Sequence, residues 1–203
     1  MAKQAKKKGA AKRRPTRKPQ LLDSITGTDA LAILKVLAER HENLAQEIDA
    51  VAKELLSHVD IDEVAANVQM ELEGLHVEDV WDRSGATREG YVDPGEAAWD
   101  MFAEALKPFQ DEVDKYKQLS MLEEAALTCQ GLLKGIYNFD KESSTEYKQW
   151  ATDAPGEYFS MILDDGKKLF EGQPSLSGLT EFLQTHCSDW AEWAMKSLRS
   201  RRP

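Results

Sequence analysis

Apolar side chains recur every three or four residues along most of this 203-residue chain, and no segment shows sustained alternation of apolar and polar residues. The first spacing puts side chains on one face of a helix, whereas alternation is typical of a half-buried strand. The sequence therefore predicts an all-α fold with about seven or eight helices in antiparallel hairpins. Such hairpins form either an α–α superhelix or an irregular bundle, and no clean repeat decides between the two.

Charge divides the chain into two parts. Residues 1–20 contain nine of the 26 Lys and Arg residues and no acid, whereas residues 21–198 contain 14 basic residues and all 36 acids, a net charge of −22. A segment with so few apolar side chains cannot offset the entropy that folding costs. We therefore predict a disordered basic arm over residues 1–20 and a single acidic helical domain over residues 21–203.

Two helix starts can be located from their capping residues. Asp60 with Glu63 three residues later is a capping box, and Asp93 followed by Pro94 combines an N-cap with a proline that is preformed for the first helical turn. Helices should therefore begin just after Asp60 and just after Asp93. Pro108 lies within the second of these helices and predicts a kink there or a junction between two helices.

Residues 29–57 contain neither glycine nor proline, and their apolar residues keep helical spacing throughout. One long helix would satisfy this pattern. Asn43 followed by Gln46 is also a possible cap for a second helix. We favour two helices, although the sequence leaves both arrangements open.

Residues 121–139 form a further predicted helix, whose expected inward residues are Leu122, Ala126, Cys129, Leu133 and Ile136. Gly131 and Gly135 lie four residues apart on one face, so a neighbouring helix could approach closely in a tightly packed core. Beyond this helix we expect a helical segment from Pro155 to Gly166, a loop over residues 171–178, and one last helix over residues 179–194 capped by Ser177.

Catalytic and metal-binding motifs do not stand out. Residues 58–63 and 76–79 each combine a histidine with acids, but helix capping accounts for these carboxylates. Cys129 and Cys187 have no zinc-ligand spacing. We therefore predict a non-enzymatic protein without cofactor or metal. The two thiols indicate a reducing compartment, and no apolar stretch suits a membrane span, so we expect a cytoplasmic protein without membrane contact.

Two surfaces are candidates for partner binding. Trp81, Arg83, Arg88 and Tyr91 are clustered in one polar loop, and these residue types dominate interface energies. Alternatively, the two aromatic residues pin the loop to the core and the arginines pair with nearby acids. The second surface is the arm, which suits salt-sensitive contact with nucleic acid or an acidic partner, or folds back on the acidic body. Eight of its nine cations are the candidate contacts, namely Lys6, Lys7, Lys8, Lys12, Arg13, Arg14, Arg17 and Lys18.

Three short motifs resemble a loosely defined group of bacterial helical domains. They are Ala38-Glu39-Arg40-His41-Glu42, the segment from Gly90 to Trp99, and Leu132-Leu133-Lys134-Gly135-Ile136-Tyr137. Those domains occur alone or beside SWIM-type zinc fingers and are similar to tetratricopeptide and HEAT arrays. The resemblance implies an α–α superhelix and a role in protein interaction. This chain lacks the C-x-C and C-x-H ligands of the zinc-finger members, so no metal function carries over.

These observations support two functional hypotheses. The first is a helical protein-interaction domain, and a basic partner would suit it because the predicted domain is strongly acidic. The alternative is a nucleic-acid-associated protein that is tethered through its basic arm. The sequence identifies neither the partner nor the oligomeric state nor the biological process.

Overall fold

The computed structural model describes residues 25–86, 88, 90–170 and 175–199. The predicted arm over residues 1–20 lies outside the described residues. Internal contacts group the chain into two compact units, Met1–Glu54 and Leu55–Pro203, and each unit is described by itself. The single domain expected over residues 21–203 stays a prediction.

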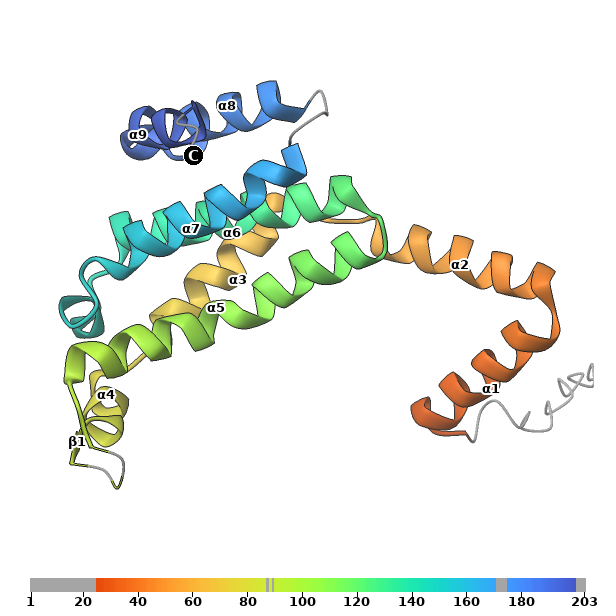
Figure 1. The fold of residues 1–203 in the computed structure, drawn as a ribbon, viewed down its shortest axis with the longest axis horizontal. Helices are drawn as coiled ribbons and strands as arrows, with labels where there is room; N and C mark the ends of the chain where they lie inside the picture. Colours follow the sequence, from red (N-terminus) through yellow and green to blue (C-terminus); the bar gives the residue numbers. More distant parts are fainter. Residues whose placement is uncertain (1–24, 87, 89, 171–174, 200–203) are drawn as a thin grey trace, which may run out of the picture. The chain divides into compact units, whose positions relative to one another are not determined.

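Helices account for nearly all of the described structure, so the predicted all-α class is confirmed. The described residues form nine α-helices, slightly more than expected, together with a 3-10 turn and a small hairpin (Figure 1). The elements are α1 (Gly27–Arg40), α2 (Glu42–Leu56), α3 (Ile61–Glu73), α4 (Val77–Arg83), β1 (Gly85–Ala86), β2 (Tyr91–Val92), α5 (Pro94–Gln118), α6 (Leu122–Glu142), η2 (Glu146–Gln149), α7 (Ala154–Phe170), α8 (Ser175–His186) and α9 (Ser188–Arg199).

The first unit contains α1 and most of α2, so the segment over residues 29–57 is two helices. The break is the single residue His41, whose extended backbone ends α1. The predicted cap at Asn43 is therefore wrong, because α2 has already begun at Glu42. Thr26 caps α1 in a reciprocal capping box with Asp29, which lowers the pKa of that carboxyl through the hydrogen bond from the Thr26 side chain.

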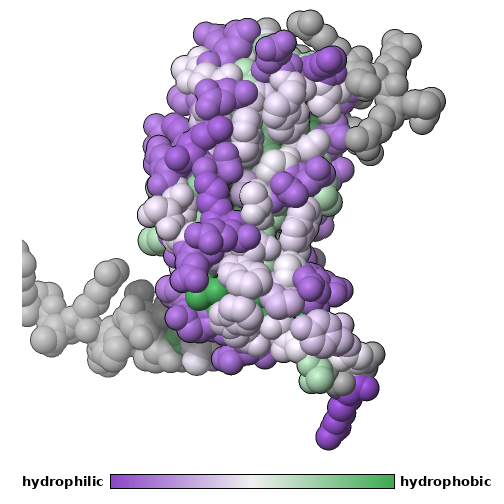
Figure 2. Space-filling view, turned by 90° about the vertical axis from the view of Figure 1, so that its left-hand side faces the viewer, coloured by the Kyte–Doolittle hydropathy of each residue, from purple (hydrophilic) through white to green (hydrophobic). Residues whose placement is uncertain are grey.

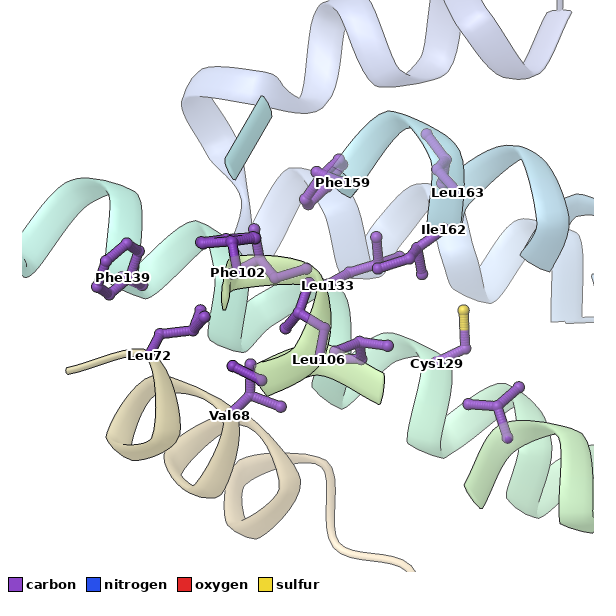
Figure 3. Packing of buried hydrophobic residues seen from close by; sticks show 14 of the residues in the cluster. Val68, Leu72, Phe102, Leu106, Cys129, Leu133, Phe139, Phe159, Ile162 and Leu163 are labelled. Atoms are coloured by element: carbon purple, nitrogen blue, oxygen red, sulfur yellow. The ribbon is translucent and has the colours of Figure 1, made fainter. Parts of the chain in front are cut away.

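In the second unit, α6 is the central helix. Eleven of its 21 residues are buried, and it packs against α3, α5 and α7. Large apolar side chains from these helices converge around it, as Figure 3 shows for Val68, Leu72, Phe102, Leu106, Leu133, Phe139, Phe159, Ile162 and Leu163. Leu122 is an exception to the predicted inward face, because it lies in the exposed first turn of the helix.

Gly131 and Gly135 allow α3 to lie directly on α6, so the neighbouring helix whose close approach the sequence predicts is α3. A Cβ atom on Gly135 would stand 2.5 Å from the Cβ of Val68, and one on Gly131 would stand 2.6 Å from the Cβ of Val64. Both distances are far below van der Waals contact. The valines of α3 therefore occupy the space that larger side chains at the two glycines of α6 would need.

The two predicted helix starts are confirmed. The Asp60 carboxylate accepts hydrogen bonds from the backbone N–H groups of Asp62 and Glu63, and the Asp93 carboxylate accepts one from Gly95. The helix that begins at Pro94 runs without interruption to Gln118, so a junction of two helices at Pro108 is wrong. Pro108 is exposed, so water can donate a hydrogen bond to the backbone carbonyl that has no N–H partner at the proline.

The C-terminal part differs from the prediction in three respects. Gly166 does not end α7, because its backbone is buried in packing that offsets the low helix propensity of glycine. The expected last helix is two helices separated by Cys187, and α8 already begins at Ser175, so Ser177 is not its cap. The expected loop over residues 171–178 is thereby shortened from its C-terminal side; residues 171–174 lie outside the described residues. His186 packs on Phe182 at 5.0 Å between ring centroids.

Both cysteines should be unreactive while the protein is folded. Cys129 and Cys187 are free and buried, and burial raises the pKa of each thiol to about 12. The thiolate is the reactive form of cysteine, and at a pKa of about 12 almost no thiolate exists at pH 8. We expect no reaction with a disulfide reagent at pH 8 in native buffer and reaction of two thiols per chain in denaturant. Rapid modification of either residue in the folded protein would contradict this burial.

Candidate interaction site

The loop that the sequence singles out is the turn from α4 into the β1–β2 hairpin, in which Gly85 pairs with Val92 and Ala86 with Tyr91. Trp81 lies in the last turn of α4 with 51% of its surface exposed and meets Trp150 edge to face at 4.7 Å. Tyr91 is 72% exposed. The hairpin therefore presents one ring that is partly held by the fold and one that points into solvent.

The two arginines of this loop differ. Arg83 forms an ion pair with Glu104 of α5 at 2.5 Å, and this hydrogen bond raises the pKa of its guanidinium. Arg88 lies exposed near the tip of the hairpin. The sequence left open that the arginines pair with neighbouring acids, and Arg83 does so. It also left open that both aromatic residues pin the loop to the core, but Tyr91 is too exposed for that role.

A second surface, which the sequence does not indicate, is an open groove of about 650 Å³ at the end of the second unit where α6 ends and α7 begins. We call it the tryptophan groove. Its lining residues are Trp99, Asp140, Thr152, Asp153, Gly156, Glu157, Ser160, Trp190 and Trp193. Three indoles and three carboxylates from α5, α6, α7, α9 and the segment before α7 therefore border one depression.

The indoles are held in place by aromatic packing. Phe159 is fully buried and meets Trp190 at 4.9 Å and Trp193 at 5.7 Å, both edge to face. On the other side, Trp99 lies 5.6 Å from Tyr158. Because the rings are ordered by neighbours that remain in the core, a ligand would meet a preformed surface.

The acids around the groove are only partly compensated. Asp140 lies near Lys141 at 3.6 Å and Lys148 at 3.7 Å. Asp153 and Glu157 form no ion pair with any residue that the structure describes. The N-terminus of α7, beside which both lie, offers about half a positive charge. The groove therefore keeps a net negative charge.

The fold itself places one cation against this aromatic cluster. Lys141 lies 5.6 Å from the centroid of the Trp190 ring and 5.7 Å from that of Tyr137, and it pairs with Asp189 at 3.2 Å. An ammonium group held between indole and carboxylate is the contact that a further cation could make in the groove.

The groove and the hairpin occupy the same end of the second unit. Trp150, on which Trp81 rests, precedes the groove residues Thr152 and Asp153 by only two and three positions. Figure 2 views the molecule from this side, and its surface is mainly hydrophilic or intermediate, with small separate hydrophobic areas. Any partner there would meet polar and aromatic groups rather than a broad aliphatic patch.

The histidine and acid clusters do not assemble into a metal site within the described part of the chain, where no group of three or more potential ligands is found. Asp60 is used as a helix cap, and Asp62 pairs with Lys134 at 2.6 Å, a contact that lowers the pKa of its carboxyl. The candidate arm cations, from Lys6 to Lys18, lie outside the described residues. No described helix combines the length and apolarity that crossing a membrane requires.

Comparisons with protein-family models, with curated proteins and with solved structures found no match to this chain. The resemblance to the bacterial helical domains therefore stays a prediction. What the chain does must be argued from the geometry of its surfaces.

Proposed function

We propose that this chain is a helical domain that binds another protein and performs no catalysis, and that the tryptophan groove is its main binding surface. The observation that carries this proposal is the meeting of Trp99, Trp190 and Trp193 with Asp153 and Glu157 around one open depression. Tryptophan contributes more than most residues to interface energies. Trp81 of α4 and Tyr91 of the hairpin extend the surface at the same end of the unit.

A basic segment is the kind of partner that fits this groove. Lys and Arg side chains are attracted both to the faces of indoles and to unpaired carboxylates. The second unit as a whole carries a net charge of −15, counting its 14 Lys and Arg against its 29 acids, and this field attracts cations over longer distances. The two unpaired thiols support the cytoplasm as the proposed compartment.

Binding of a defined lysine-rich peptide tests this proposal. Tryptophan fluorescence is a direct readout, because three of the five tryptophans line the groove. The titration uses the full chain and, to remove competition, a variant in which the eight arm cations are serine. We expect binding that the double substitution Asp153→Asn and Glu157→Gln weakens by about three- to tenfold, the range for two exposed ion pairs.

The matched control removes two acids from other helix starts. Glu63 and Glu123 are exposed in the first turns of α3 and α6, so Glu63→Gln with Glu123→Gln causes the same change in net charge. We expect this control to bind nearly as well as the unmodified chain. If both double substitutions weaken binding equally, the peptide is attracted only by the overall negative charge of the protein. An unaltered affinity in the groove variant would refute the groove as the binding site.

The alternative function is nucleic-acid association, favoured by the nine cations and absence of acids in residues 1–20. It predicts binding to duplex DNA or RNA that falls steeply between about 50 and 200 mM salt, since each neutralised phosphate releases counterions. Replacing the eight arm cations with serine should abolish that binding while leaving the groove titration intact. Nucleic-acid binding that survives the replacement would contradict tethering through the arm.

A further inference from the structure

The helices of the first unit have no fully buried face, although Leu37, Leu44 and Ile48 are half-buried. No residue of α1 or α2 is buried, although both helices carry large apolar side chains. Leu31 is 53% exposed, Leu34 44% and Val51 49%. Figure 1 shows α1 and α2 meeting at an open angle, and their mutual contact is slight.

A pair of helices in this state needs a partner. Isolated helices of 14 and 15 residues are marginal in water, and segments below about 40 residues need a disulfide, a metal or association to fold stably. Neither cysteine lies in the first unit, since the two are Cys129 and Cys187. No group of potential metal ligands is found among the described residues, so association is the remaining one of the three.

The sequence of the two helices indicates the kind of association. Leu34 and Leu37 in α1, and Leu44, Ile48 and Val51 in α2, keep the three- or four-residue spacing of a helical face. An alanine follows Leu37, Leu44 and Val51, so the apolar stripe covers about three of every seven positions. A stripe of that width is typical of helices that pack in a bundle, whereas a two-stranded coiled coil needs only two of seven.

We propose that a second copy of this chain covers the stripe, so that two α1–α2 pairs pack together as a four-helix cluster. Charge allows this occupant. Residues 25–54 contain six acids and three basic residues, a net charge of −3. The residues of α1 alone are neutral overall, with Asp29, Lys35, Glu39 and Arg40. Two such segments repel each other only weakly, so charge does not prevent their contact.

The area is sufficient for a concentration-dependent dimer. The 14 residues of α1 and the 15 residues of α2 extend for about 21 and about 22 Å at 1.5 Å per residue, about 44 Å of helix together. A stripe about 100° wide along that length exposes roughly 500 Å² in each copy, or about 1,000 Å² in a dimer. This lies at the lower limit for a specific interface. The inference is independent of the tryptophan groove and concerns self-association alone.

Sedimentation of the full chain over about 1–500 µM tests this interface. We expect the mass to rise from one chain to two within that range. Substituting Leu34→Glu together with Val51→Glu should keep the chain monomeric at every concentration, because four charges would enter the apolar contact. Both residues are substantially exposed in the single chain, so helicity measured by circular dichroism at low concentration should change little.

The matched control places the same charges on the opposite faces. Ala32 and Gln46 are exposed and lie outside the stripe, and the variant Ala32→Glu with Gln46→Glu should dimerise as the unmodified chain does. A chain that stays monomeric at 500 µM would overturn the proposal. A dimer that forms equally well with Leu34→Glu and Val51→Glu would also overturn it, since another surface would then be responsible.

Discussion

Replacing Gly135 with alanine is expected to lower the free energy of unfolding by about 1–3 kcal/mol, although the same change in an open helix raises it by up to about 1 kcal/mol. The sign reverses because the new Cβ would stand 2.5 Å from the Cβ of Val68 and 2.7 Å from the carbonyl oxygen of Ala65. The second contact is with backbone, so α3 and α6 must separate. Denaturant unfolding followed by tryptophan fluorescence measures this change, since all five tryptophans lie in the second unit.

Gly156→Ala is the matched control for this effect. Gly156 lies in α7, and a Cβ there meets nothing within 4 Å, so its replacement should be neutral or slightly stabilising. Combining Gly135→Ala with Val68→Ala should cost somewhat less than the sum of the two single changes, because alanine lacks the Cγ1 that the new Cβ would meet at 2.7 Å. Equal stabilisation by Gly135→Ala and Gly156→Ala would show that α3 does not pack tightly on α6.

Replacing Phe102 with alanine should cost about 3–5 kcal/mol of unfolding free energy, the usual range for a large buried aromatic residue. Phe102 is fully buried, and its ring lies 5.3 Å from Tyr158 and 6.0 Å from Phe139. The cavity would open where α5, α6 and α7 meet. The measurement is the same denaturant titration.

Phe109→Ala is the comparison for Phe102, since Phe109 lies on the same helix and is only half-buried. The loss of unfolding free energy in Phe109→Ala should be clearly smaller than in Phe102→Ala, because less buried apolar surface is removed. A cost below about 1 kcal/mol for Phe102→Ala, or equal costs for both residues, would contradict the central position of Phe102 between the helices.

Local signals in the sequence were enough to predict the class of fold and several helix boundaries. The caps at Asp60 and Asp93 act through hydrogen bonds within three residues, so they are visible in a short stretch of chain. The glycines at 131 and 135 were recognisable as a contact face, but the valines that fill them come from a helix more than 60 residues earlier. The pattern predicted a close approach without identifying its partner.

Features that depend on tertiary packing could not be predicted. The break at His41 has neither glycine nor proline to mark it, and Gly166 stays helical because its surroundings offset its propensity. The tryptophan groove joins Trp99 with Trp190 and Trp193, about 90 residues away. The spacing of Trp190 and Trp193 by one helical turn was the only local sign of an aromatic face there.

The measurement that tests the proposed binding surface most directly is NMR of the ¹⁵N-labelled full chain, in which each of the five tryptophans contributes one indole N–H signal. Signals are assigned by single tryptophan-to-phenylalanine substitutions. On addition of the lysine-rich peptide, the indole signals of Trp99, Trp190 and Trp193 should shift together and saturate at the affinity that fluorescence gives. If the peptide binds while these three signals stay unmoved, the groove is not the binding site.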